Sequence, residues 1–142
     1  MSLSLPPEIS QRELELRRVA SDLKKTGQFA AAEGKYLEAW HVLPEPRHLW
    51  DTSQSVLRSI VRFYFESSIY AQAELWAKEL FNCDPLLNDT GAYILLGKIY
   101  MEWGKDDLAR ENLVKAYEMG GRRGFVGEDP KYLKFAQTQM KK

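Results

Sequence analysis

The chain has 142 residues, of which 44% are hydrophobic and 28% charged, a composition typical of one folded domain and not of a disordered chain. Twenty basic residues balance twenty acidic ones, so no overall charge attracts the protein to nucleic acid or to an anionic membrane. A single cysteine, Cys83, excludes an internal disulfide, and the first residues lack the basic and apolar stretches of an export signal. We expect one cytoplasmic domain spanning residues 1–142.

Three helical hairpins are predicted along the chain. Apolar residues recur at three- and four-residue spacing, the period of amphipathic helices, on both sides of three short breaks. The breaks lie around Gly27, Ser67-Ser68 and Gly104. The three units cover residues 13–46, 54–87 and 90–123, and the unequal spacing of their starts places extra residues between the first two units, at 45–51.

Prolines lie only where a helix accepts them, at helix starts or between hairpins. These are Pro6, Pro7, Pro44, Pro46, Pro85 and Pro130. Asp129 before Pro130 forms an N-cap signal, which predicts a final amphipathic helix over residues 129–140 that covers the open end of the stack. The Gly-Gly-Arg-Arg-Gly stretch at residues 120–124 is expected to be a flexible loop before this helix.

The three units resemble the tetratricopeptide repeat (TPR) family, whose pattern of about 34 residues places bulky, small and aromatic residues at fixed intervals. The third unit carries the pattern most clearly, with Tyr93, Leu96, Gly97, Tyr100, Ala109, Leu113 and Ala116. The first has Leu16, Val19, Ala20, Leu23, Ala32, Tyr36, Ala39 and Pro44, and the second Leu57, Ile60, Val61, Tyr64, Ala73, Ala77, Leu80 and Pro85. Val61 and Ala77 depart from the pattern, so the second repeat is the least regular.

The resemblance implies an all-α fold, a right-handed superhelical stack of three TPR-like hairpins with a C-terminal capping helix. Small residues such as Ala20, Gly97 and Ala109 fit this arrangement because they let two helices approach closely. TPR arrays bind proteins, although the fold alone does not determine the function.

A narrower likeness lies in the turn at residues 43–46, in Trp50-Asp51, and in the ending from Gly120 to Tyr132. These segments resemble small bacterial TPR proteins associated with polymorphic toxin systems, where they act as immunity proteins. This likeness implies a cognate toxin domain as the partner. A generic adaptor or co-chaperone that gathers proteins without neutralising one is the alternative.

The first helices of TPR repeats line a concave groove, and their non-packing face is the expected binding surface. In this chain it consists of Arg17, Ser21, Lys24, Lys25, Arg58, Arg62, Phe65, Glu66, Ile94, Lys98, Met101 and Glu102. Cations recur at matching places in the three units. This pattern predicts a cationic ladder, a row of positive side chains with apolar side chains between them, that binds an acidic protein surface. The plainer interpretation is a solvated helix face.

Other chemistry has little support in the sequence. Arg17 and Lys98 stand near the places of a carboxylate clamp found in some TPR co-chaperones, but Ser21 and Arg62 do not match it. Residues 120–124 lack the spacing of a phosphate-binding loop, and four tryptophans at helical spacing are typical of packing and not of base stacking. His41, His48 and Cys83 have no partners at catalytic or metal-binding intervals, so we expect no enzyme, metal, cofactor or small-molecule substrate.

Overall fold

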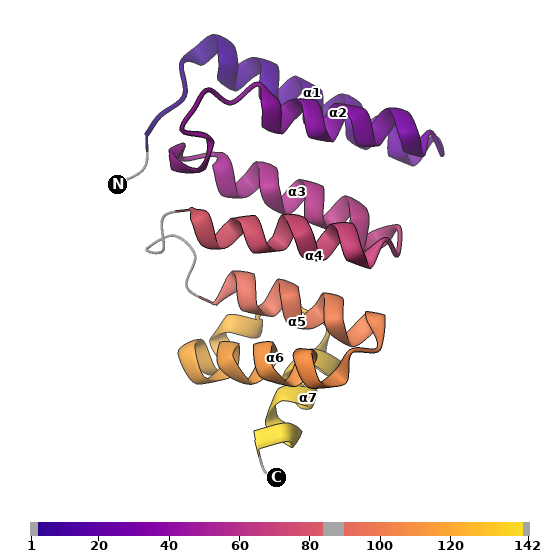
Figure 1. Cartoon of the computed structure of the whole chain (residues 1–142), viewed down its shortest axis with the longest axis vertical. Coiled ribbons are helices and arrows are strands. Elements are labelled where there is room, and N and C mark those ends of the chain that lie inside the picture. The colour runs from indigo at the N-terminus through magenta and orange to yellow at the C-terminus, as the bar shows by residue number, and fades with distance from the viewer. Residues whose placement is uncertain (1–2, 84–89, 141–142) are drawn as a thin grey trace.

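The computed structural model describes residues 3–83 and 90–140, and this part of the chain is all-helical (Figure 1). It holds seven α-helices, as predicted: α1 (Pro7–Lys25), α2 (Phe29–His41), α3 (Ser53–Glu66), α4 (Tyr70–Lys78), α5 (Gly91–Trp103), α6 (Asp106–Gly120) and α7 (Pro130–Met140). Three short 3-10 helices accompany them: η1 (Arg47–Leu49), η2 (Glu79–Asn82) and η4 (Gly121–Phe125). Within the described residues the β-type pairing consists of one isolated bridge between Leu3 and Trp50.

The helices pair into three antiparallel hairpins that lie one below another in Figure 1. Helix α1 packs on α2, α3 on α4, and α5 on α6, while α2 contacts α3 and α4 contacts α5. One core cluster of buried residues runs from α1 to α6, and a second lies beneath α7. Each hairpin therefore buries apolar surface against its neighbours in the chain.

The ends of the helices follow the predicted signals. Pro7 occupies the first position of α1, and Lys24 and Lys25 lie in its last turn, where cations interact favourably with the helix dipole. Gly27 and Gly104 have φ angles of 79° and 82°, a left-handed conformation that glycine adopts without steric cost. Ser68 has a φ of 60° in the second hairpin turn, so this turn is formed without glycine. Pro85 lies outside the described residues.

Small residues lie where the helices of a hairpin cross. Ala20, Ala32, Ala73 and Ala109 are fully buried. A Cβ atom added at Gly97 would lie 2.4 Å from the Leu113 side chain, so glycine is required for the close contact between α5 and α6. Val61 and Ala77, the departures from the repeat pattern, are also fully buried and fill the second hairpin with a different distribution of volume.

The extra residues between the first two hairpins form an ordered connection that contains η1. The Trp50 Nε1–H donates to the Pro44 carbonyl at 2.8 Å, and the buried Ser53 hydroxyl donates to the Arg47 carbonyl at 2.5 Å. The N-terminal segment supports this connection, since the Leu3 N–H donates to the Leu49 carbonyl. These bonds hold η1 beside the start of α3.

The expected flexible loop at residues 120–124 was wrong. Residues Gly121–Phe125 form η4, which holds the Phe125 side chain in the second core cluster at 5% exposure. Helix α7 follows, and the Asp129 side chain accepts a hydrogen bond from the Lys131 N–H at 3.0 Å, the N-cap that the sequence predicts. Burial of Phe125 explains the order of η4, because a large aromatic anchor ties the segment to α5 and α6.

Candidate protein-binding groove

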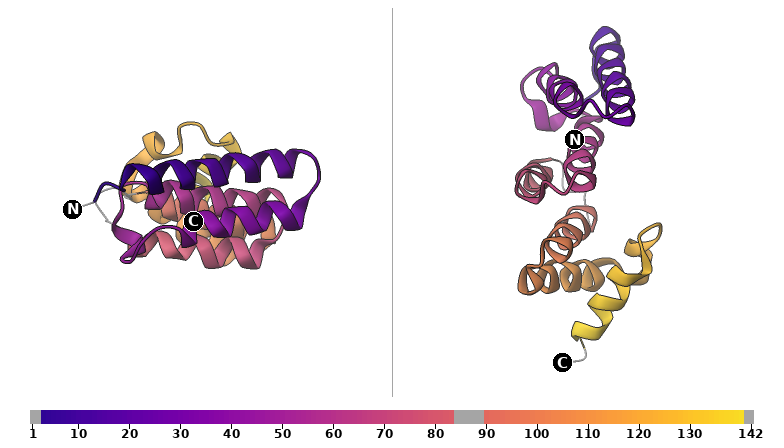
Figure 2. Two further views of the ribbon diagram at one scale, coloured as in Figure 1. Left: turned by 90° about the horizontal axis from the view of Figure 1, so that it is seen from above. Right: turned by 90° about the vertical axis from the view of Figure 1, so that its right-hand side faces the viewer.

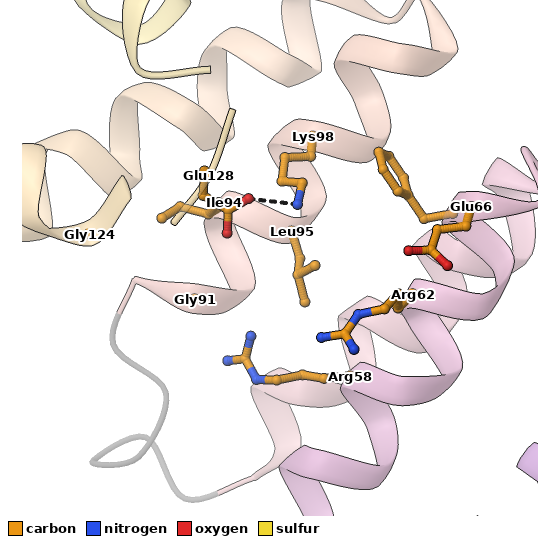
Figure 3. A pocket seen from close by; sticks show the side chains of 10 residues that line it. Arg58, Arg62, Glu66, Gly91, Ile94, Leu95, Lys98, Gly124 and Glu128 are labelled. Carbon is orange, nitrogen blue, oxygen red and sulfur yellow. Dashed lines mark hydrogen bonds and ion pairs between the residues drawn. The ribbon is translucent and has the colours of Figure 1, made fainter. Parts of the chain in front are cut away.

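A pocket of about 270 Å³ lies between α3, α5 and the segment that joins η4 to α7 (Figure 3). Six of the twelve predicted groove residues line it: Arg58, Arg62, Phe65, Glu66, Ile94 and Lys98. It is also lined by four residues that the sequence analysis missed: Gly91, Leu95, Gly124 and Glu128. Gly91 and Leu95 share a face of α5 with Lys98, so helical spacing would have found them. Glu128 is far from them in sequence, and no local pattern would have placed it here.

Two arginines one turn apart on α3 extend into this pocket in Figure 3. The Arg58 guanidinium lies against the start of α5, where a Cβ atom added at Gly91 would come within 2.4 Å of it. Arg62 is exposed and forms no ion pair with any described residue. The pair of guanidinium groups can bind a carboxylate with parallel hydrogen bonds.

Lys98, on the opposite wall, already binds a carboxylate of its own chain. Its Nζ lies 2.7 Å from Glu128 Oε1, and both side chains are mostly covered. The same Nζ lies 5.5 Å from the ring centroid of Phe65 and 5.6 Å from that of Tyr132, within cation–π range. Lys98 is therefore held in one place and its charge is matched internally.

The first hairpin contributes cations that are also matched within the chain. Arg17 binds both carboxylate oxygens of Glu13, at 2.5 and 2.9 Å, and donates to the Ser59 hydroxyl at 3.2 Å. Glu13 is only 1% exposed, so this is a buried ion pair. Lys24 pairs with Glu66 across α1 and α3. Acids from other turns and helices thus pair with three cations of the predicted ladder, Arg17, Lys24 and Lys98, whereas Lys25 is exposed.

The C-terminal segment covers part of the third unit's predicted surface. Ile94 is 3% exposed and packs with Phe125 and Tyr132 in the second core cluster, so its side chain is not an exposed apolar contact of the ladder. Met101 is partly buried against both clusters. Ser21 is half-buried on α1. The expectation of an open face here was wrong because α7 and η4 return to α5 through contacts that helical spacing does not reveal.

Glu102 is held by α7. Its carboxylate accepts hydrogen bonds from Lys131 at 2.9 Å and from the Tyr132 hydroxyl at 2.8 Å. The bond from Lys131, followed by that from Tyr132, lowers the pKa of Glu102. Glu102 therefore stays charged and fixes the capping helix to α5.

The single cysteine and both histidines lie among the described residues. Cys83 is 4% exposed, and burial, reinforced by Glu79, raises the pKa of its thiol to about 11. His41 is exposed, and His48 binds Glu79 at 2.8 Å. No group of three or more histidine, cysteine or acidic side chains in residues 3–83 and 90–140 is placed to hold a metal ion. The groove, by contrast, is lined by cations and apolar side chains.

Comparison of the chain with known protein families found no match, and a search of curated proteins found none either. Among the described helices, none combines the length and apolar character needed to cross a membrane.

Proposed function

We propose that this chain is a non-enzymatic protein-binding module, and most specifically a cytoplasmic immunity protein that binds and neutralises a cognate bacterial toxin. The observation that carries the proposal is the pocket between α3 and α5, which Arg58 and Arg62 enter from one side. Phe65 and Leu95 supply apolar surface in the same pocket. A cavity with a few convergent polar groups and an apolar wall is typical of a site that anchors a side chain of a partner.

The proposal includes a TPR-like architecture, in which the three hairpins form a right-handed superhelix and the first helices line its concave side. Two observations support it. The hairpins stack in chain order, and the positions that the repeat pattern reserves for small residues are buried at the helix crossings, as for Ala20, Ala73 and Ala109. In the right-hand view of Figure 2, α2 and α4 lie on one side of the stack and the segment from η4 to α7 lies on the other.

The partner we propose is an acidic protein surface. Lys98 supports this chemistry because it binds the Glu128 carboxylate at the edge of the same pocket, so the site accommodates one acid of its own chain. Arg62, which has no ion pair within the described residues, adds a guanidinium exposed to a partner. Complementary charge accelerates association and disfavours wrong partners.

The experiment begins with the gene next to that of this chain. A toxin-like neighbour is expressed with and without the chain, and cell growth is measured. We expect the chain to restore growth and to bind the purified toxin domain in calorimetry. Reversing both pocket arginines, Arg58→Glu with Arg62→Glu, should abolish protection and weaken binding by about tenfold or more, since two attractive contacts become repulsive.

A matched control is the double reversal Arg122→Glu with Arg123→Glu, which makes the same charge change on exposed residues of η4 outside this pocket. It should leave protection intact. If the Arg122→Glu, Arg123→Glu control loses protection and the Arg58→Glu, Arg62→Glu variant does not, the binding surface is at η4 and not in the pocket. If the unaltered chain binds the toxin-like protein but gives no protection, the immunity role is wrong and an adaptor role replaces it. If the chain neither binds nor protects, this protein is not the partner and the immunity proposal fails.

A further inference from the structure

A second pocket lies on the side of the stack that α2 and α4 form, away from the groove. Its volume is about 340 Å³, and its walls come from α2, from α4, from η2 and from the connection that contains η1. The right-hand view of Figure 2 places these elements opposite the segment from η4 to α7. The pocket shares no residue with the groove, so its chemistry is independent of the proposed function.

Aromatic rings form the inner part of this pocket. Trp40 and Trp76 meet nearly at a right angle, with ring centroids 6.3 Å apart and an interplanar angle of 86°. The His48 ring lies 5.1 Å from Trp40 on another side. Of the residues that line the pocket, Trp40 is buried, Trp76 is half-buried, and Leu75 is 62% exposed. Indole faces attract cations through the ring quadrupole.

Two carboxylates stand at the same pocket. Glu79 Oε2 accepts hydrogen bonds from His48 and from Asn82, and Glu45 Oε1 accepts one from Arg47 at 2.7 Å. The second oxygen of each carboxylate has no hydrogen-bond donor among the described residues. Apart from the His48 ring, the pocket is lined by two carboxylates and one guanidinium, an excess of one formal negative charge.

We propose that this aromatic pocket binds the side chain of an arginine presented by a protein partner. A guanidinium stacks on an indole face and donates to carboxylates in the same plane, so it satisfies both features of the pocket. Its aliphatic stem would cover the exposed Leu75 side chain, which a small inorganic cation would leave in water. The pocket thus complements a basic residue, whereas the groove complements an acidic one.

The test uses the indole N–H signals of the folded chain in nuclear magnetic resonance. N-acetyl-arginine amide is titrated in, with the citrulline analogue as an uncharged probe of nearly the same shape. We expect saturable shifts of the Trp40 and Trp76 signals with arginine and binding about tenfold weaker with citrulline, because the charge-assisted hydrogen bonds are lost. Trp103 lies outside the pocket and serves as an internal reference.

Variants identify the groups responsible. Glu45→Gln and Glu79→Gln should each weaken arginine binding several-fold while the thermal melt stays intact, and Glu118→Gln, an exposed acid of α6, should have no effect. Equal binding of citrulline, or no saturable shift at all, would overturn the proposal. Tetramethylammonium binding as tightly as the arginine probe would assign the pocket to small organic cations instead. None of these results affects the groove, which is tested with Arg58 and Arg62.

Discussion

The Tyr64 hydroxyl on α3 donates a hydrogen bond of 2.7 Å to Glu33 on α2, and so joins the second hairpin to the first. The third hairpin repeats this relationship, because the Tyr100 hydroxyl on α5 donates to Glu74 on α4 at 2.5 Å. Both tyrosines are almost completely buried. A recurring tyrosine–glutamate bond therefore links the second and the third hairpin to the one before it.

Removing either hydroxyl should destabilise the stack. We expect Tyr64→Phe and Tyr100→Phe each to lower the free energy of unfolding by about 1–2 kcal/mol, since each deletes a hydrogen bond to a charged acceptor and leaves that carboxylate partly covered. Denaturant unfolding measures this change. Tyr93→Phe is the control, because the Tyr93 hydroxyl has no hydrogen-bond partner within the described residues. An equal loss in all three variants would argue against the interhelical bonds.

Three tyrosine hydroxyls that donate to glutamates should make stability depend on pH in alkaline solution. Burial, followed by hydrogen bonding to a glutamate, raises the pKa of Tyr64, Tyr100 and Tyr132 above the ordinary value of 10.0. The folded chain therefore keeps protons that the unfolded chain releases, so this stabilisation is complete below about pH 10 and falls as the pH rises further. Unfolding free energies measured between about pH 9 and 11 should decline, and more gently in Tyr100→Phe. A flat profile would contradict the prediction.

One substitution should have opposite effects at two helical glycines. Gly97→Ala places a methyl group 2.4 Å from Leu113 and should destabilise the third hairpin by about 1–3 kcal/mol. Gly34→Ala on α2 meets no atom within 4 Å and should stabilise the chain by up to about 1 kcal/mol, because alanine is the better helix former. Thermal melts compare the two variants. Stabilisation by Gly97→Ala would mean that α5 and α6 lie farther apart than described.

We expect the main contribution of Arg17 to be to the stability of the fold and not to the binding of a partner. Replacing it with alanine leaves the buried Glu13 carboxylate without its guanidinium, which should cost about 3 kcal/mol or more in unfolding free energy. Arg18→Ala is the matched control, because Arg18 pairs with Glu15 and Asp22 on the exposed side of α1 and should have little effect. The double change of Arg17→Met with Glu13→Leu should recover most of the loss. Equal melting temperatures for Arg17→Ala and Arg18→Ala would contradict the prediction that Arg17 stabilises the core through Glu13.

The helices and their breaks were predictable from sequence because their causes are local. Apolar spacing within α3, the glycine at Gly27 and the proline at Pro130 each act on neighbouring backbone, so short stretches suffice to identify them. The buried alanines were also predictable, since small residues at repeat intervals indicate a helix crossing. The resemblance to TPR arrays, whose first helices line a groove, identified six of the residues that line the groove pocket.

Tertiary structure alone decided which charges remain available. Lys24 and Glu66 are 42 residues apart, and Lys98 and Glu128 are 30 apart, so helical spacing identified the cations but not the acids that reach them. Likewise, the burial of Ile94 depends on how η4 and α7 return to α5. The period of a helix determines which side chains share a face. What covers that face depends on distant segments whose packing minimises exposed apolar surface and pairs buried charges.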